Sequence, residues 1–127
     1  MGITVTWDNE AMTITRIVFS GSYSITDLLD AFRTESEMIQ DVEHAVCSIV
    51  VFEEFPMSIR YFDVASVREV LDEIYPKNLC LTVAVTTSPM LTHLLRTIPI
   101  HTPHTVKIVT TEGHAYRAIE QHRSAAK

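Results

Sequence analysis

The sequence feature that most constrains the fold is an apolar run that leads directly into a helix start. Residues 79–85 (LCLTVAV) are apolar at every position except Thr82. A strand with one exposed face would alternate apolar and polar residues, so this run predicts a strand covered on both faces. Ser88 is a typical helix N-cap, and Pro89 is favoured at the first position of a helix. The segment therefore predicts a buried strand followed by a helix, which is half of a β-α-β unit.

A second apolar run, residues 46–52 (VCSIVVF), predicts another buried strand. In the helix expected after Ser24, Ser24 and Asp27 form a capping-box pattern, and Glu35 is assigned to the polar, outward face. The remaining elements are strands at residues 3–7, 12–19 and 106–109, and helices starting near Asp63, Ser88 and Thr110 or Thr111. We therefore predict one α/β domain over residues 1–127. It is a sandwich with a mixed, mostly parallel sheet of about five strands, an N-terminal antiparallel hairpin and four helices.

The composition narrows the classes of partner. Hydrophobic residues make up 46% of the chain, which predicts a packed core. The formal net charge of −6 argues against nonspecific binding of nucleic acid or anionic membranes. No apolar run reaches the roughly 20 residues that cross a bilayer, and no signal-peptide pattern is present. We expect a cytoplasmic protein in which Cys47 and Cys80 are reduced core residues, and a disulfide between neighbouring strands is the alternative.

Four segments carry a family resemblance. They are the opening hairpin ITVTWDNEAMTITRIVFSG, the helix from Ser24, the strand CSIVVFEEF, and the ending VKIVTTEGHAYRAIEQ with its T-x-x-x-A pattern. In this order they resemble the STAS family of sulfate-transporter and anti-sigma-factor-antagonist domains. The similarity is to the SpoIIAA-like branch, which is grouped with Sec14-type domains. The resemblance implies a SpoIIAA/STAS-like fold and a regulatory role through contacts with other proteins.

The resemblance also implies a place for phosphorylation. STAS antagonists carry a turn similar to Asp-Ser-Ser-Gly-Leu after the buried strand, and one of its serines is phosphorylated. The matching place here is residues 62–67 (FDVASV), where Asp63 fits but Val64 occupies the phosphorylated position. Ser58 and Ser66 are the nearby candidates for phosphorylation.

The candidate binding residues lie where strands are expected to end, because ligands of open α/β sheets bind beyond the carboxyl ends of the strands. Residues 55–62 also carry more large apolar side chains than a loop needs, which predicts a patch or a lid over the core. The polar residues among the candidates could instead serve only to end strands and to cap helices. The candidates are Phe55, Met57, Ser58, Ile59, Arg60, Tyr61, Asp63, Thr87 and Ser88.

No catalytic pattern accompanies these candidates. Glu53 and Glu54 are adjacent, so in a strand they would point to opposite faces and could not act as a paired acid and base. His101 and His104 lie in a loop without an acidic residue or cysteine, so we expect no metal site and no cofactor.

The predicted function is therefore a non-enzymatic, cytosolic STAS-like regulatory or interaction module. It would act through protein–protein contacts, with another protein or with itself as a homodimer. The alternative is a small-molecule or lipid carrier with an apolar pocket near residues 55–62.

Overall fold

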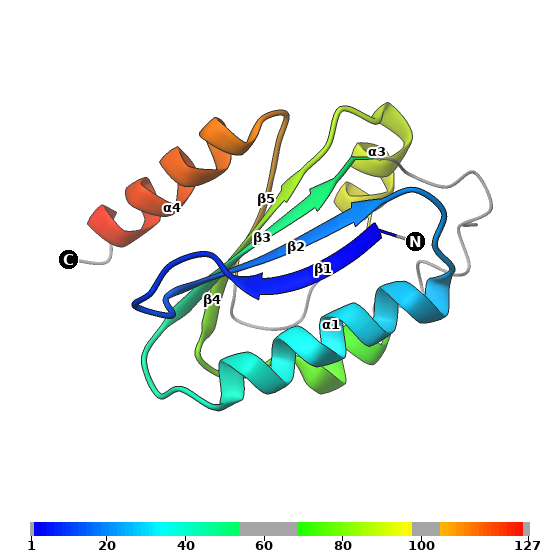
Figure 1. The fold of residues 1–127 in the computed structure, drawn as a ribbon. Helices are drawn as coiled ribbons and strands as arrows, with labels where there is room; N and C mark the ends of the chain where they lie inside the picture. Colours follow the sequence, from blue (N-terminus) through cyan, green and yellow to red (C-terminus); the bar gives the residue numbers. More distant parts are fainter. Residues whose placement is uncertain (1, 54–68, 98–104, 126–127) are drawn as a thin grey trace.

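The protein is an α/β domain, seen here in a computed structural model that describes residues 2–53, 69–97 and 105–125 (Figure 1). Its five strands are β1 (Gly2–Trp7), β2 (Ile14–Ser20), β3 (Val46–Phe52), β4 (Leu79–Val85) and β5 (Thr105–Val109). The helices are α1 (Ile25–Gln40), α3 (Pro89–Thr97) and α4 (Glu112–Ala125), and residues 69–74 are also helical. The predicted fold class is confirmed, with a mixed five-stranded sheet and four helices.

The strands lie in the sheet in the order in which they occur in the chain, β1-β2-β3-β4-β5. β1 pairs with β2 in antiparallel fashion, and the three other pairs are parallel. The predicted hairpin is therefore confirmed, but β2 begins at Ile14 rather than at residue 12. The reason is a turn in which the Asn9 side-chain oxygen accepts hydrogen bonds from the backbone N–H groups of Thr13 (3.0 Å) and Ile14 (3.3 Å). Met12 lies in this turn with a left-handed φ of 54°.

The two faces of the sheet are covered unequally. α1, α3 and the helical residues 69–74 pack on one face, and α4 packs on the other (Figure 1). Parallel strands joined in sequence by right-handed crossovers place all of their connecting helices on the same face. α4 follows the last strand and is not a crossover, so it covers the opposite face alone.

The core consists of two layers of side chains, one on each face of the two central strands. On the α1 face, Phe19 lies at the centre of an aromatic group and stacks on Phe52 with ring centroids 5.2 Å apart. On the α4 face, branched residues of β3 and β4 such as Ile49 and Val83 pack against Ala115 and Ile119. Every residue of β3 is buried, and so is every residue of β4 except the half-buried Cys80. The prediction of two strands covered on both faces is confirmed.

Local hydrogen bonds start the helices where the sequence predicts. Ser24 and Asp27 form the expected capping box at the start of α1. The side-chain oxygen of Thr111 accepts a hydrogen bond from the backbone N–H of His114 (3.1 Å) at the start of α4. These interactions satisfy N–H groups that have no partner within a helix.

The turn between α1 and β3 depends on Asn78, which lies immediately before β4. Its side-chain NH₂ group donates to the backbone carbonyls of Ile39 (2.9 Å), Val42 (3.0 Å) and His44 (3.1 Å). The backbone carbonyl of Asn78 also accepts a hydrogen bond from the backbone N–H of Val46 (2.8 Å). One side chain immediately before β4 therefore holds the chain that enters β3.

Candidate functional site

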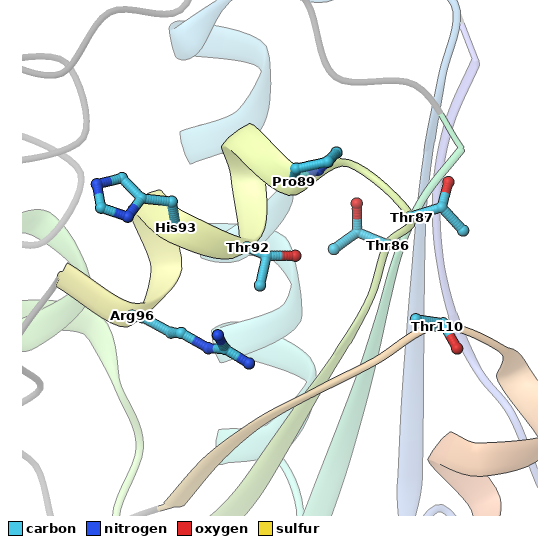
Figure 2. A pocket seen from close by; sticks show the side chains of 7 residues that line it. All are labelled: Thr86, Thr87, Pro89, Thr92, His93, Arg96 and Thr110. Atoms are coloured by element: carbon cyan, nitrogen blue, oxygen red, sulfur yellow. The ribbon is translucent and has the colours of Figure 1, made fainter.

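A cleft of about 320 Å³ lies at the carboxyl ends of β4 and β5, beside α3 (Figure 2). We call it the α3 cleft. It is lined by Thr86, Thr87, Pro89, Thr92, His93, Arg96 and Thr110. This is the edge of an open α/β sheet where ligands usually bind. The structure therefore brings the predicted candidate Thr87 into a cleft together with Thr92 and Arg96, which the sequence analysis did not single out.

The wall formed by the sheet is positioned by Thr86, the buried residue that follows β4. Its backbone N–H donates to the carbonyl of Val109 (3.0 Å), which continues the pairing of β4 with β5 by one residue. Its hydroxyl oxygen accepts a hydrogen bond from the backbone N–H of Ser88 (3.0 Å). The turn from β4 into α3 is thus fixed at both of its ends, while Thr87 between them is exposed.

The helical wall of the cleft starts at Ser88, which acts as the predicted N-cap. Its side-chain oxygen accepts a hydrogen bond from the backbone N–H of Leu91 (3.2 Å), and its carbonyl accepts one from the hydroxyl of Thr92 (2.9 Å). Ser88 is therefore adjacent to the cleft, but its side chain is occupied in capping. Leu91 and Leu94 anchor α3 to the core, so the neighbouring residues of the helix are held in place beside the strands.

The charge of the α3 cleft differs from that of the whole chain. Arg96 and His93 are exposed side chains in its lining, and none of the described residues that line it is acidic. The whole chain carries a formal charge of −6. In Figure 2 the Arg96 side chain runs from α3 toward β5, on the side of the helix where the threonines lie. A guanidinium group beside several hydroxyls is a suitable arrangement for a carboxylate or another oxyanion.

A second polar group lies in the core beneath α1, and here the sequence analysis was wrong. Glu35, assigned to the outer face of its helix, is only 3% exposed. It accepts hydrogen bonds from the hydroxyls of Thr15 (2.9 Å) and Ser48 (2.5 Å). Burial raises the pKa of the Glu35 carboxyl to about 7, although both hydroxyl contacts act in the opposite direction. The spacing could have revealed this position, because Leu28, Phe32, Glu35 and Ile39 follow one another on the same helical face.

The partners of Glu35 form a polar row across the sheet. Thr15 is aligned with Ser48, and Ser48 is aligned with Thr82 in the next strand. The Thr82 hydroxyl is buried and has no hydrogen-bond partner. Ser48 and Thr82 are each a single polar position within an apolar run, which is the signal in the sequence. Since the row is shielded from solvent, we interpret it as part of the core and not as a binding site.

Most of the predicted site residues lie outside the part of the chain that the structure describes. These are Phe55, Met57, Ser58, Ile59, Arg60, Tyr61, Asp63 and Ser66. Their roles in partner binding, in ligand binding and in phosphorylation remain predictions. The loop with His101 and His104 also lies outside the described residues. Within residues 2–53, 69–97 and 105–125, no three His, Cys, Asp or Glu side chains are grouped as a metal site would require.

Comparisons with known proteins do not add an assignment. No protein-family model, curated protein or solved structure matches the chain. Among the described residues, no helix is long and apolar enough to cross a membrane.

Proposed function

We propose that the protein is a non-enzymatic, STAS-like interaction module that binds an acidic segment of a protein partner in the α3 cleft. The order of strands and helices is the order that the STAS resemblance implies, which supports this class of protein. The position of the cleft at the carboxyl edge of the sheet supports a recognition role for it.

The charge of the cleft is the observation that carries the proposal. Arg96 and His93 are exposed in the lining without an acidic neighbour among the described lining residues. The whole chain, by contrast, has 16 acidic residues against 10 Lys and Arg residues. A complementary partner therefore presents a carboxylate, which the guanidinium group can bind through two parallel hydrogen bonds.

The exposure of the cleft favours a protein partner over a free small molecule. Thr87, His93 and Arg96 are all exposed, so a small occupant would keep much of its surface in water. Small-molecule sites usually enclose most of the ligand surface. An exposed ion pair alone contributes no more than about 1 kcal/mol, so further contacts have to supply affinity. Met90, which is 43% exposed at the start of α3, offers an apolar contact next to the cleft.

The proposal can be tested by NMR with a short synthetic peptide of alternating glutamate and leucine as the probe. We expect shifts of the backbone amide signals of Thr86, Thr87, Thr92, Arg96 and Thr110. Replacing glutamate by glutamine in the peptide should abolish these shifts, and so should the variant Arg96→Gln. The matched control is Arg33→Gln, because Arg33 is an exposed arginine of α1 and lies outside the cleft. Shifts that persist in Arg96→Gln, or that are lost equally in Arg33→Gln, would contradict the proposal.

Self-association is one form that the same interaction can take, because a second copy of the chain also supplies acidic side chains. We propose a homodimer on this basis. Light scattering of the purified protein should then give twice the chain mass at micromolar concentration, and Arg96→Gln should shift the equilibrium toward the monomer. A wild-type protein that is monomeric throughout this range would remove the homodimer and leave a different protein as the partner. The alternative function, an apolar carrier with its pocket near residues 55–62, concerns residues outside the described ranges and gains no support from the described ones.

A further inference from the structure

The only two cysteines of the sequence meet on the sheet face that α4 covers. The ladder between β3 and β4 shifts by one residue at this place, so that Val46 is aligned with Leu79 but Cys47 is aligned with Leu81. Cys80 is the extra residue of this irregularity. A bulge of this kind places two residues of one strand opposite one residue of its neighbour. The regular alternation of side chains between the two faces of the sheet is therefore interrupted at the bulge. Cys80 accordingly packs against the cluster that contains Cys47 and Leu81.

The two cysteines are close neighbours. Cys80 belongs to the strand that is paired with the strand of Cys47, and it packs in the same cluster of side chains. Its Sγ also donates to the backbone carbonyl of Val46 (3.4 Å), the residue before Cys47. Both cysteines are free thiols in this structure. The irregular pairing at the start of β3 and β4 therefore brings two free thiols to the same face of the sheet, on neighbouring strands.

The two thiols differ in access. Cys47 is 2% exposed, whereas Cys80 is half-buried and can be reached by a reagent first. Burial is the main cause that raises the pKa of the Cys47 thiol to about 11, and the neighbouring Cys80 raises it further. The Arg123 guanidinium, in the last turn of α4, acts in the opposite direction. Arg123 also donates to the carbonyl of Thr13 (3.3 Å), so this turn of α4 is attached directly above the cysteines.

We propose that Cys47 and Cys80 are a redox modification site, at which an oxidant of the disulfide class converts the two thiols into an intrachain disulfide. The Cys80 thiolate attacks one sulfur of the oxidant and forms a mixed disulfide, while the other half of the oxidant leaves as a thiolate and takes up a proton. The Cys47 thiolate then attacks the Cys80 sulfur and expels the second half as a thiol. The oxidant gains two electrons and two protons, and the two cysteines lose them.

The position of the site predicts a local consequence. The new bond joins the starts of β3 and β4. It also removes the Cys47 thiol, whose pKa the Arg123 guanidinium lowers. The last turn of α4 keeps the hydrogen bond from Arg123 to Thr13. The modification site lies at the amino ends of the parallel strands, whereas the α3 cleft lies at their carboxyl ends. The two proposals are therefore independent.

The test uses the folded wild-type chain and oxidised glutathione as the oxidant. Intact mass spectrometry should show the loss of two hydrogen atoms with no glutathione retained, and peptide mapping without reduction should join the peptides of Cys47 and Cys80. Cys47→Ala should stop at the mixed disulfide and retain one glutathione on Cys80. Cys80→Ala should react at least tenfold more slowly than the wild type, because the remaining Cys47 thiol is buried.

The wild-type result decides the proposal, so it does not depend on whether the variants fold. A wild-type protein that retains one or two glutathione groups without forming the internal bond would overturn it, and so would unchanged mass after prolonged exposure. Disulfide-linked dimers in place of an intrachain bond would overturn it as well. Circular dichroism of the two alanine variants checks that their reaction rates refer to folded protein.

Discussion

The carboxyl group of Glu35 makes the stability of the fold depend on pH. Its pKa is raised by burial from an ordinary value of 4.5 to about 7. Between these values the folded protein binds more protons at Glu35 than the unfolded chain does. The free energy of unfolding should therefore fall as the pH rises through this range, by up to about 3 kcal/mol, and level off above pH 7. Urea unfolding at pH 5 and pH 8 measures the difference.

Two substitutions by glutamine separate the pH dependence caused by Glu35 from that caused by other groups. Glu35→Gln should remove most of the difference between pH 5 and pH 8, since an amide does not titrate. Glu37→Gln, on the exposed side of the same helix, should leave the difference unchanged. Burial, and after it the nearby Glu35, raises the pKa of the Tyr75 hydroxyl, so Tyr75 stays neutral at pH 8. An equal pH dependence in the wild type and in Glu35→Gln would show that another group is responsible.

Single residues also show where sequence analysis reaches its limit. The capping roles of Ser24 and Ser88 were predicted, because a cap needs only its own sequence neighbours. The roles of Asn78 and Thr15 were not predicted. Each of them contacts residues more than ten positions away in the sequence, and no local pattern encodes that contact. Glu35 was misassigned even though its helical spacing was available.

At the scale of elements, α4 is the helix whose packing has the clearest consequence, because it covers its face of the sheet alone. Ile119 is 1% exposed and packs on the central strands beside Ala115 and Ala118. Ile119→Ala should lower the free energy of unfolding by about 2–5 kcal/mol, since the cavity has no second helix that could move in to fill it. Chemical denaturation monitored by circular dichroism measures the loss.

The matched control is a substitution in the ion pair that joins the same helix to the sheet. Arg16 of β2 forms an ion pair with Glu112 at the start of α4, and their side chains are 32% and 44% exposed. Arg16→Gln should lower the free energy of unfolding by less than about 1 kcal/mol, because water screens such pairs. If this variant lost as much stability as Ile119→Ala, the apolar contact would not be the main attachment of α4.

Elements differ in how far the sequence predicts them. The two central strands were predicted residue by residue at 46–52 and 79–85, because burial on both faces leaves a continuous apolar run. The bounds of β2 were less accurate, since the turn at Asn9 depends on side-chain hydrogen bonds. The sequence predicted helices on both faces of the sheet, but not which helix covers which face. In the structure, α4 covers its face alone.

At the scale of the whole molecule, the topology explains why only part of the α3 cleft could be predicted. Strand order and crossover direction place the ends of β4 and β5 side by side, and Thr87 follows from that rule. Arg96 and His93 come from the third and second turns of α3, and their position depends on how this helix packs against the core. A sheet edge can be derived from the sequence pattern, but the composition of a helical wall beside it requires the packed structure.

The same topology predicts how the domain opens. β3 and β4 are paired on both edges and buried on both faces, so their amide hydrogens should exchange with solvent only through global unfolding. β1 is an edge strand in which no residue is fully buried, so its amides should exchange through local opening. Native-state hydrogen exchange at increasing denaturant distinguishes the two, because exchange through global unfolding has a steep denaturant dependence. Equal exchange rates and slopes for β1 and β3 would mean that the hairpin belongs to the same cooperative unit as the central strands, and that its position at the edge does not govern its stability.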